Sequence, residues 1–400
     1  MAPRAAAVES VHSVEGAARS TSAPCDRPPL FDPADFVIPS GITHVCAGGE
    51  SAPLRSHLDA FVAWLEDKAA GPVGRDRLDE HVVQARAGLA ARFGVALDDV
   101  GIVSSVAEGM SALIGSIDWR PGDNVCVAAT EFPSLVVPVR LLRAGPEVKV
   151  APGSLADPPR FEDVISPRTR MVAVSHVSYW SGLRLGLADL RSLCDAVGAL
   201  LVVDFTQSAG VLPTDASVAD FAFAASFKWL LGGHGAAAGV WNRERQPDWQ
   251  PRSGGWNTVI PPPVPDHFAE LHLRPGAARL TPGNVAYPSV YLLENGLRYL
   301  DRHPTTAVAA HVEALAMHLL VGLGGFGIDP LTPLDPTERA ANVAFRYRGA
   351  EDLARRLAVR GVLVWGSEGR LRVSVHGYNN SADIERVLGA ISAEWREDGT

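Results

Sequence analysis

The sequence predicts an α/β protein whose larger domain is a mainly parallel sheet covered by helices. From about residue 84 to residue 242, short apolar runs rich in β-forming residues alternate with stretches of helical periodicity, as in repeated strand–helix–strand units. A chain of 400 residues is also long enough for one large and one smaller domain. Between Gln246 and Gly276 the chain is rich in Pro, Gly and Trp, which predicts an irregular connection that separates the two regular regions.

Seven apolar runs are predicted as the strands of the sheet. They are Val100–Ser104, Asn124–Ala129, Val148–Ala151, Met171–Ser175, Leu200–Asp204, Phe221–Ala225 and Ala236–Trp241. A helix is predicted over Leu187–Val197, where apolar residues recur every three or four positions. A long helix is expected after Tyr287, and two strands around a turn at Gly366–Gly369 are expected within Val362–Val375.

The chain is predicted to divide into three parts. Residues 1–28 are rich in Ala, Ser, Arg and Pro and lack the apolar segment of a secretory signal, so we expect a mobile tail. Residues 29–276 are assigned to the large domain. Residues 277–400 are assigned to the smaller C-terminal domain. No internal repeat is recognised.

Composition excludes several classes of function. The net charge of -9 argues against nucleic acid as the main partner, and no uninterrupted apolar stretch is long enough to cross a bilayer. The cysteines, Cys25, Cys46, Cys126 and Cys194, include no CxxC pair and have no His at metal-ligand spacing. We therefore predict a soluble cytoplasmic protein with no metal site and no disulfide framework.

Lysine is rare in this chain, and one lysine stands in a setting suited to catalysis. Of the 36 basic residues only Lys68, Lys149 and Lys228 are lysines. Lys228 follows the predicted strand Phe221–Ala225, at the point where open α/β sheets bind ligands, and Phe227 and Trp229 give it apolar flanks. A desolvated amine of lowered pKa forms imines with carbonyl compounds. An ordinary surface lysine is the alternative.

Asp204 ends the predicted strand Leu200–Asp204, twenty-four residues before Lys228. A carboxylate at the end of a buried strand requires a cationic partner. The protonated ring nitrogen of a pyridine cofactor would be such a partner, and Gln207 could then donate a hydrogen bond to the phenolic oxygen of that ring. Taken alone, Asp204 could equally be a helix cap or one member of an ion pair.

Two further segments have features of a cofactor site. Val103–Ser111 predicts a strand, a turn and a helix N-terminus, where free backbone N–H groups bind phosphate. Phe132 follows the next strand and could stack on a planar ring, or could be a core residue. Gly233, Gly235 and Ala238 match a dinucleotide fingerprint, but the segment continues into a predicted strand instead of a helix, so that interpretation is rejected.

With Asp204, Gln207 and Lys228 in place, the chain resembles the class V aminotransferase family of fold-type I pyridoxal-phosphate enzymes, over roughly residues 80–390. That family includes cysteine desulfurases, kynureninases and isopenicillin N epimerase. The resemblance implies a seven-stranded sheet sandwiched by helices and a small C-terminal α+β domain. It further implies that Lys228 holds pyridoxal 5'-phosphate as a Schiff base and moves protons. It implies that Asp204 binds the pyridine nitrogen and that Gln207 meets the phenolic oxygen.

The same resemblance assigns further residues. Phe132 would stack on the cofactor, and the phosphate would lie near Ser226 and the turn of Val106, Ala107 and Glu108. Trp256, Asn257 and Asn284 would reach the phosphate of a neighbouring subunit, which implies a homodimer with active sites at the subunit interface. Arg372, in the segment R-V-S-V-H-G-Y-N, would bind the substrate carboxylate. Tyr179 and Trp180 could face the substrate, as could His176 and His376, whereas His234 has no assigned role.

The chain departs from the family pattern in two informative ways. Val106 and Ala107 stand where the family often has threonines, so phosphate binding must depend on backbone N–H groups and on nearby Ser104 or Ser105. No cysteine follows Cys194, whereas cysteine desulfurases carry their persulfide-forming cysteine in the C-terminal part of the chain. We therefore do not expect a desulfurase of that kind.

The predicted function is a pyridoxal-phosphate enzyme that acts on an amino acid or amino-acid conjugate through an external aldimine. The F-P-S context at Phe132 resembles that of kynureninases, and this resemblance favours cleavage at the β-carbon by a C–S or C–C lyase. An aminotransferase, an epimerase and a decarboxylation-coupled deaminase remain alternatives on the same scaffold. A non-catalytic binding module with this fold is the alternative from another class.

Overall fold

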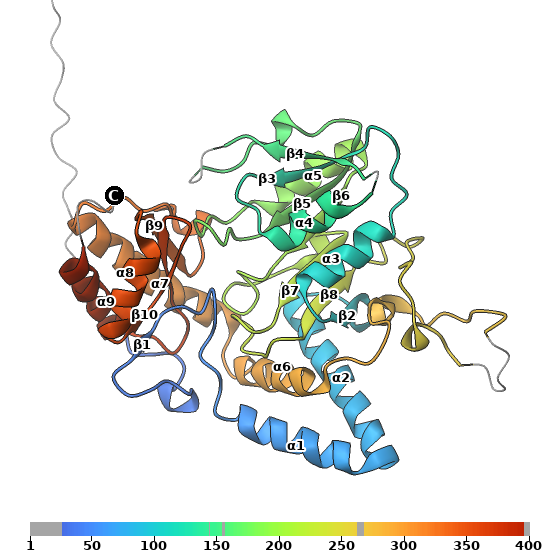
Figure 1. Ribbon diagram of the computed structural model, residues 1–400, viewed down its shortest axis with the longest axis horizontal. Helices are drawn as coiled ribbons and strands as arrows, with labels where there is room; N and C mark the ends of the chain where they lie inside the picture. Colours follow the sequence, from blue (N-terminus) through green and yellow to red (C-terminus); the bar gives the residue numbers. More distant parts are fainter. Residues whose placement is uncertain (1–25, 144, 154–156, 262–267, 396–400) are drawn as a thin grey trace, which may run out of the picture.

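The computed structural model describes residues 26–395 except residue 144, residues 154–156 and residues 262–267. Residues 1–25 of the predicted tail therefore lie outside the described residues. In Figure 1 the large sheet and its helices lie on one side, and the C-terminal elements from α7 to α9 lie together on the other.

A seven-stranded sheet forms the centre of the large domain, in the order β2-β8-β7-β6-β5-β3-β4. Its strands are β2 (Val100–Val103), β3 (Asn124–Ala128), β4 (Glu147–Ala151), β5 (Thr169–Ser175), β6 (Leu200–Asp204), β7 (Phe221–Ala225) and β8 (Ala237–Trp241). Strands β3 to β7 pair in parallel, whereas β8 is antiparallel to both β2 and β7. All seven predicted strands and the mainly parallel sheet are confirmed.

Helices cover both faces of this sheet because neighbouring side chains of each strand point to opposite faces. Val172 and Val174 of β5 belong to the core that includes residues of α2 (Gly71–Phe93) and α5 (Leu187–Val197). The intervening Ala173 belongs to the core formed with α3 (Val106–Gly115) and α4 (Pro133–Leu141). The strands are therefore apolar on both faces, and the predicted helix Leu187–Val197 is confirmed as α5.

The smaller domain contains two short sheets and three helices. Strands β9 (Asn342–Arg346), β11 (Trp365–Ser367) and β12 (Arg370–Ser374) form an antiparallel sheet in the order β11-β12-β9. The helices are α7 (Thr305–Gly325), α8 (Ala350–Val359) and α9 (Ser381–Glu394). Strand β1 (Thr43–His44) pairs in parallel with β10 (Val362–Leu363), so the N-terminal segment joins the small domain. Figure 1 shows this segment in blue beside the red C-terminal elements.

The region predicted as two strands within Val362–Val375 contains three. The first run divides into β10 and β11, which belong to different sheets, and the hairpin turn lies at Glu368 and Gly369, both with left-handed φ angles of 56° and 72°. The prediction of a single first strand was wrong because pairing of β10 with the distant β1 leaves no signal in the local sequence.

Two long helices follow the irregular connection. Helix α6 (Tyr287–Leu300), predicted after Tyr287, packs on α1 (His57–Ala69) and α2 of the large domain. The boundary placed at residue 277 stays a prediction. Helix α7 is long and apolar enough to cross a membrane by length and composition, with a mean hydropathy of 1.6. It packs against α9 and β9, and it buries Val308, Val312, Leu315 and Leu319, as a core helix does.

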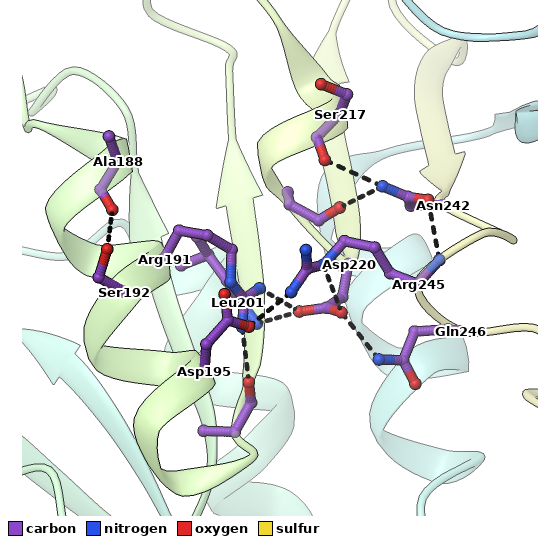
Figure 2. A network of polar contacts seen from close by, with 12 residues as sticks. Ala188, Arg191, Ser192, Asp195, Leu201, Ser217, Asp220, Asn242, Arg245 and Gln246 are labelled. Carbon is purple, nitrogen blue, oxygen red and sulfur yellow. Dashed lines mark hydrogen bonds and ion pairs between the residues drawn. The ribbon is translucent and has the colours of Figure 1, made fainter.

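A buried aspartate fixes the edge of the sheet where β6 and β7 begin (Figure 2). The Asp220 carboxylate, 2% exposed, accepts hydrogen bonds from Arg191 Nη1 at 2.5 Å, from the Leu201 backbone N–H at 2.7 Å and from Gln246 Nε2 at 2.7 Å. Arg245 Nε adds a longer contact of 3.4 Å. One carboxylate therefore joins α5, β6 and the segment after β8.

Replacing Asp220 by Asn should destabilise the protein by about 3 kcal/mol, because the buried Arg191 would lose its buried counter-charge and keep only the half-exposed Asp195. The measurement is the urea midpoint of unfolding followed by circular dichroism. Asp118→Asn, which breaks an exposed pair with Arg252, is the control and should leave the midpoint unchanged. Equal midpoints for the Asp220 variant and the wild type would contradict this account.

Candidate active site

The carboxyl ends of the parallel strands meet at the opposite edge of the sheet and deliver polar residues there. Strand β5 ends at Ser175, β6 ends at Asp204 and β7 ends three residues before Lys228. Ser175 and Asp204 are register partners, as are Asp204 and Phe223. The residues singled out in the sequence therefore gather at one place because parallel strands share an edge.

Lys228 is buried and lies between two aromatic rings. Its side chain is 8% exposed, and its Nζ lies 5.5 Å from the ring centroid of Phe132 and 5.4 Å from that of Phe227. Burial lowers the pKa of Lys228 to about 8, and the nearby Arg372 acts in the same direction, whereas Asp204 and Glu50 oppose the shift. The amine is therefore much closer to its neutral, nucleophilic form than an ordinary lysine at neutral pH.

Asp204 is 3% exposed and is electrostatically coupled to Lys228. Its Oδ1 accepts a hydrogen bond of 2.8 Å from the Thr206 backbone N–H. Burial raises the pKa of Asp204, while Thr206 and the charge of Lys228 work against that shift. A buried carboxylate beside a buried amine suits the binding of a cationic ring N–H.

Gln207 is a junction between three segments of the chain. Its Nε2 donates to the Gly48 carbonyl at 2.9 Å, and its Oε1 accepts from Trp229 Nε1 and Asn342 Nδ2, both at 3.0 Å. A side chain at Gly48 would collide with Asn342 and Ser374, so this close approach requires glycine. The contact with a phenolic oxygen stays a prediction.

Arg372 faces the same site from β12 of the small domain. It is 3% exposed, and its Nη1 donates to the Tyr179 carbonyl at 2.7 Å. The Tyr179 ring stands edge-on to Phe132, with the centroids 5.0 Å apart, and edge-on to Trp180 at 6.3 Å. The predicted ring-stacking and substrate-binding residues therefore form one continuous wall that begins beside Lys228.

Sequence reasoning missed Glu131, the residue before Phe132. Its carboxylate accepts hydrogen bonds from the Ser175 backbone N–H and the Phe132 backbone N–H, both at 2.8 Å, and from the Ser175 hydroxyl. Burial raises the pKa of Glu131 to about 7, and the Asp204 carboxylate adds to the shift. A sequence signal for Glu131 was present, because this carboxylate comes soon after a buried strand, just as Asp204 is the last residue of one.

The predicted phosphate turn is the N-terminus of α3, which packs on β7. Ser105 caps the helix, since its side chain accepts from the Glu108 N–H at 3.1 Å, and Glu108 in turn accepts from the Ser104 N–H at 2.5 Å. Val106 is buried, and Ala107 lies in the first turn of the helix. Phosphate binding by this turn stays a prediction.

Ser226 is fully buried, and its hydroxyl lies against backbone carbonyls. Its Oγ is 2.8 Å from the Gly233 oxygen and 2.7 Å from the Ala236 oxygen. In this arrangement the hydroxyl holds the loop between Lys228 and β8. To bind a phosphate as predicted, Ser226 would have to donate its one hydroxyl hydrogen to the phosphate instead of to these carbonyls.

Trp256, Asn257 and Asn284 lie together, but in a different pocket. They line it with Gly283, Arg75 and Tyr287, and Arg75 Nη1 donates to Asn284 Oδ1 at 3.2 Å. Lys228 does not line this pocket. Any contact of these residues with a cofactor would therefore involve a second subunit, which stays a prediction.

Three histidines were left without a definite role by the sequence, namely His176, His376 and His234, and the structure shows the contacts of each. His176 bonds to the Ser208 hydroxyl at 3.0 Å, and His376 bonds to the Trp229 carbonyl at 3.2 Å and to the Gly377 N–H at 2.8 Å. Burial lowers the pKa of each of these two to about 3. His234 is exposed and stacks on Phe227 at 4.1 Å. His176 and His376 are therefore neutral packing residues.

The fold and this site define a class of enzyme that holds an aldehyde cofactor on a lysine. The buried amine of Lys228, the buried carboxylate of Asp204 and the ring of Phe132 fit a pyridine cofactor, since they supply a nucleophile, a partner for a ring N–H and a flat apolar surface.

The chain belongs to the aminotransferase class-V family, whose sequence pattern matches residues 74–387. It is 25% identical over 336 residues to a probable cysteine desulfurase of Methanothermobacter thermautotrophicus, covering 77% of this chain and 82% of the relative. It is 25% identical over 289 residues to the kynureninase of Burkholderia mallei, covering 69% of each chain.

Solved structures share the fold at lower identity. The cysteine desulfurase of Thermococcus onnurineus NA1 matches with a TM-score of 0.81 and 20% identity, covering 90% of this chain and 96% of that one. A lysine-to-alanine variant of C-DES, with glycine covalently linked to its PLP cofactor, matches with a TM-score of 0.83 and 20% identity over 90% and 99%. The predicted family, the fold-type I architecture and pyridoxal 5'-phosphate (PLP) as the cofactor are confirmed.

In the cofactor-free protein, acylation of the Lys228 amine should speed up as the pH rises through about 8, because only the neutral amine reacts. The site of acylation and its rate are measured by peptide mass spectrometry. Arg372→Met should move the midpoint to higher pH, since it removes a cation that lowers the pKa of Lys228. Arg355→Met, at an exposed position of α8, is the matched control. A midpoint at the ordinary lysine value of about 10.4 would contradict the burial argument.

Proposed function

We propose that this protein is a PLP-dependent lyase that cleaves a C–S or C–C bond at the β-carbon of an amino acid or amino-acid conjugate. The observation that carries the proposal is the buried amine of Lys228, with its lowered pKa, coupled to Asp204 and Arg372. When bound, the cofactor supplies an electron sink for the substrate carbanion. Lys228 holds the cofactor and afterwards moves protons at its Nζ.

The other residues position the reactants. Asp204 keeps the ring nitrogen protonated, and Phe132 packs on the ring. The N–H groups of Val106 and Ala107 at the start of α3 bind the phosphate. Glu108, whose own N–H is donated to Ser105, and Ser226 lie beside them. Arg372 binds the substrate α-carboxylate through its planar fork, and Tyr179 and Trp180 shield the site from water.

Two observations support lyase chemistry. One relative is named a kynureninase, and a solved structure with a TM-score of 0.81 is titled as the cystine C-S lyase C-DES with its product cysteine persulfide. Transamination, epimerisation and decarboxylation-coupled deamination use the same residues and stay alternatives. A non-catalytic binding module would not need a buried lysine amine.

We further propose that the enzyme does not form a persulfide on one of its own cysteines, although one relative is named a probable cysteine desulfurase. The described cysteines are Cys46, Cys126 and Cys194. Burial raises the pKa of all three thiols, that of Cys46 to about 11, which disfavours the nucleophilic thiolate. Their free thiols also support the cytoplasm as the location.

A homodimer is the proposed assembly. Leu58, Phe61, Val62 and Leu65 form an exposed apolar stripe on α1, with exposed fractions of 40–70%. These positions follow helical spacing and face away from Ala60 and Asp67, which are buried on the other side of α1. Helix α1 packs on α2, and α2 carries Arg75 of the pocket lined by Trp256, Asn257 and Asn284. If a second subunit packed on this apolar stripe of α1, Trp256, Asn257 and Asn284 of one subunit would lie beside the cofactor phosphate of the other.

With PLP added, the protein should show a visible absorbance band that Lys228→Ala abolishes and that Lys68→Ala leaves in place, because Lys68 is exposed on α1. The measurement is an absorbance spectrum before and after dialysis. A band that persists in the Lys228 variant would refute the assigned lysine.

The product masses from a panel of amino acids and sulfur conjugates, including cystine, then identify the reaction. Cleavage at the β-carbon leaves a three-carbon product, pyruvate or alanine. An intact carbon skeleton as a keto acid would instead indicate an aminotransferase, an unchanged mass with inverted chirality an epimerase, and loss of CO₂ the decarboxylating alternative.

The double substitution Phe61→Glu and Leu65→Glu should convert the dimer to a monomer, because buried like charges oppose association at an apolar interface. The molar mass is measured by light scattering after gel filtration. Val359→Glu, at an exposed apolar position of α8 in the small domain, is the control. A monomeric wild type, or a dimer that survives the double substitution, would refute the interface.

A further inference from the structure

A second arginine lies beside Arg372 on the same face of β12. Arg370 and Arg372 are two residues apart on this strand, so their side chains point to the same face. Arg370 is 1% exposed. Its guanidinium carbon lies 4.6 Å from the ring centroid of Trp180 and 5.2 Å from that of Tyr179. The wall that leads from Phe132 past Tyr179 therefore ends at a buried cation.

The hydrogen-bonding capacity of this cation is largely unused. Within the described part of the chain, Nε and Nη1 of Arg370 are buried with no hydrogen-bond partner, and so is Nε1 of the adjacent Trp180. Other buried guanidiniums also have an unpartnered Nε, but two of them are held by a carboxylate at a short distance. Arg191 is 2.5 Å from Asp220, and Arg339 is 2.8 Å from Glu313.

The charge of Arg370 is poorly balanced. The ion pair found for it is a long one, 3.6 Å from Nη2 to Glu368, whose side chain is 54% exposed. Its neighbour Arg372 is buried as well, and burial together with the charge of Arg370 lowers the pKa of Arg372 to about 9. Two buried cations side by side are costly unless anions neutralise both of them. One α-carboxylate neutralises one.

We propose that Arg370 binds a second carboxylate of the substrate, so that the substrate is an amino acid or amino-acid conjugate whose side chain ends in a carboxylate. The inference rests on the proposed function, in which Arg372 holds the α-carboxylate. The incoming carboxylate accepts hydrogen bonds from Arg370 Nε and Nη2, which form the side-on fork of the guanidinium, and from Trp180 Nε1. It thereby displaces Glu368 from Nη2.

The geometry of the strand sets the spacing of the two carboxylates. Alternate residues on a strand are about 6.8 Å apart, and both side chains lie on the same face of β12. A flexible chain with two carboxylates spans this distance, whereas the α-carboxylate alone reaches one arginine. Glu368 lies in the exposed turn between β11 and β12, where it can move away without disturbing the core.

The test uses glutarate and pentanoate, which have the same carbon skeleton but two carboxylates and one carboxylate. Neither carries an amine, so neither reacts with the cofactor. Isothermal titration calorimetry on the PLP-loaded protein should give a dissociation constant at least about tenfold lower for glutarate, because charge-assisted hydrogen bonds of this kind are worth that factor. Equal affinities would overturn the proposal.

Substitutions then test whether Arg370 is responsible for the preference for glutarate over pentanoate. Arg370→Met should abolish the preference for glutarate, and the control Arg355→Met should keep it. Glu368→Gln should tighten glutarate binding by several-fold and leave pentanoate unchanged, because it removes the competing carboxylate. A preference that survives Arg370→Met overturns the proposal.

Folding and cofactor loading are checked independently. The Lys228-dependent absorbance band reports on the proposed function, and the glutarate preference reports on Arg370, so a protein with the band and no preference overturns this inference alone. If Arg370→Met does not fold, the exposed substitution Glu368→Gln decides, and unchanged glutarate affinity in that variant overturns the proposal.

Discussion

The relative position of the two domains at the site depends on the amide side chain of Gln207. Its nitrogen binds the backbone of the N-terminal segment at Gly48, and its oxygen binds Trp229, next to Lys228, and Asn342 of β9. Asn342 in turn accepts from Ser374 at 2.6 Å, two residues after Arg372. The distance between Lys228 and the arginines of β12 is therefore fixed by a short series of buried hydrogen bonds that join different segments of the chain.

The two edges of the large sheet perform different tasks because parallel strands all begin at one edge and end at the other. At the edge where β6 and β7 begin, Asp220 is surrounded by donors from its own chain, and the charges balance. At the edge where they end, Asp204 and Lys228 are close enough for their charges to interact, and Arg372 of the small domain acts on Lys228 as well. The first edge stabilises the fold, and the second is available to a cofactor and a substrate.

The strands and the central site residues could be predicted because their signals are local. Each apolar run forms a strand of the large sheet; Asp204 is the last residue of its strand, and Lys228 lies three residues after its strand. The pairing of β10 with β1 could not be predicted, because it joins residues more than 300 positions apart. The sequence also could not predict that Gly48 approaches Gln207, because the two residues are far apart in the chain. For the same reason it could not predict that Arg370 is buried under Tyr179 and Trp180. Alternation along β12 would have placed Arg370 beside Arg372, but not the aromatic rings over it.

Burial alone does not distinguish polar residues that bind a ligand from polar residues that stabilise the fold. The two kinds differ in whether their polar atoms find hydrogen-bond partners within the chain. His376 and Ser226 are fully buried, and both find partners in nearby backbone. Arg370 is as deeply buried, yet Nε and Nη1 find none among the described residues, and its long ion pair is with an exposed turn. An unpaired buried donor costs free energy in the folded chain. Most such donors among the described residues lie elsewhere, but Trp180, Arg370 and Arg372 bring several together along the wall, where an anionic ligand would return that energy on binding.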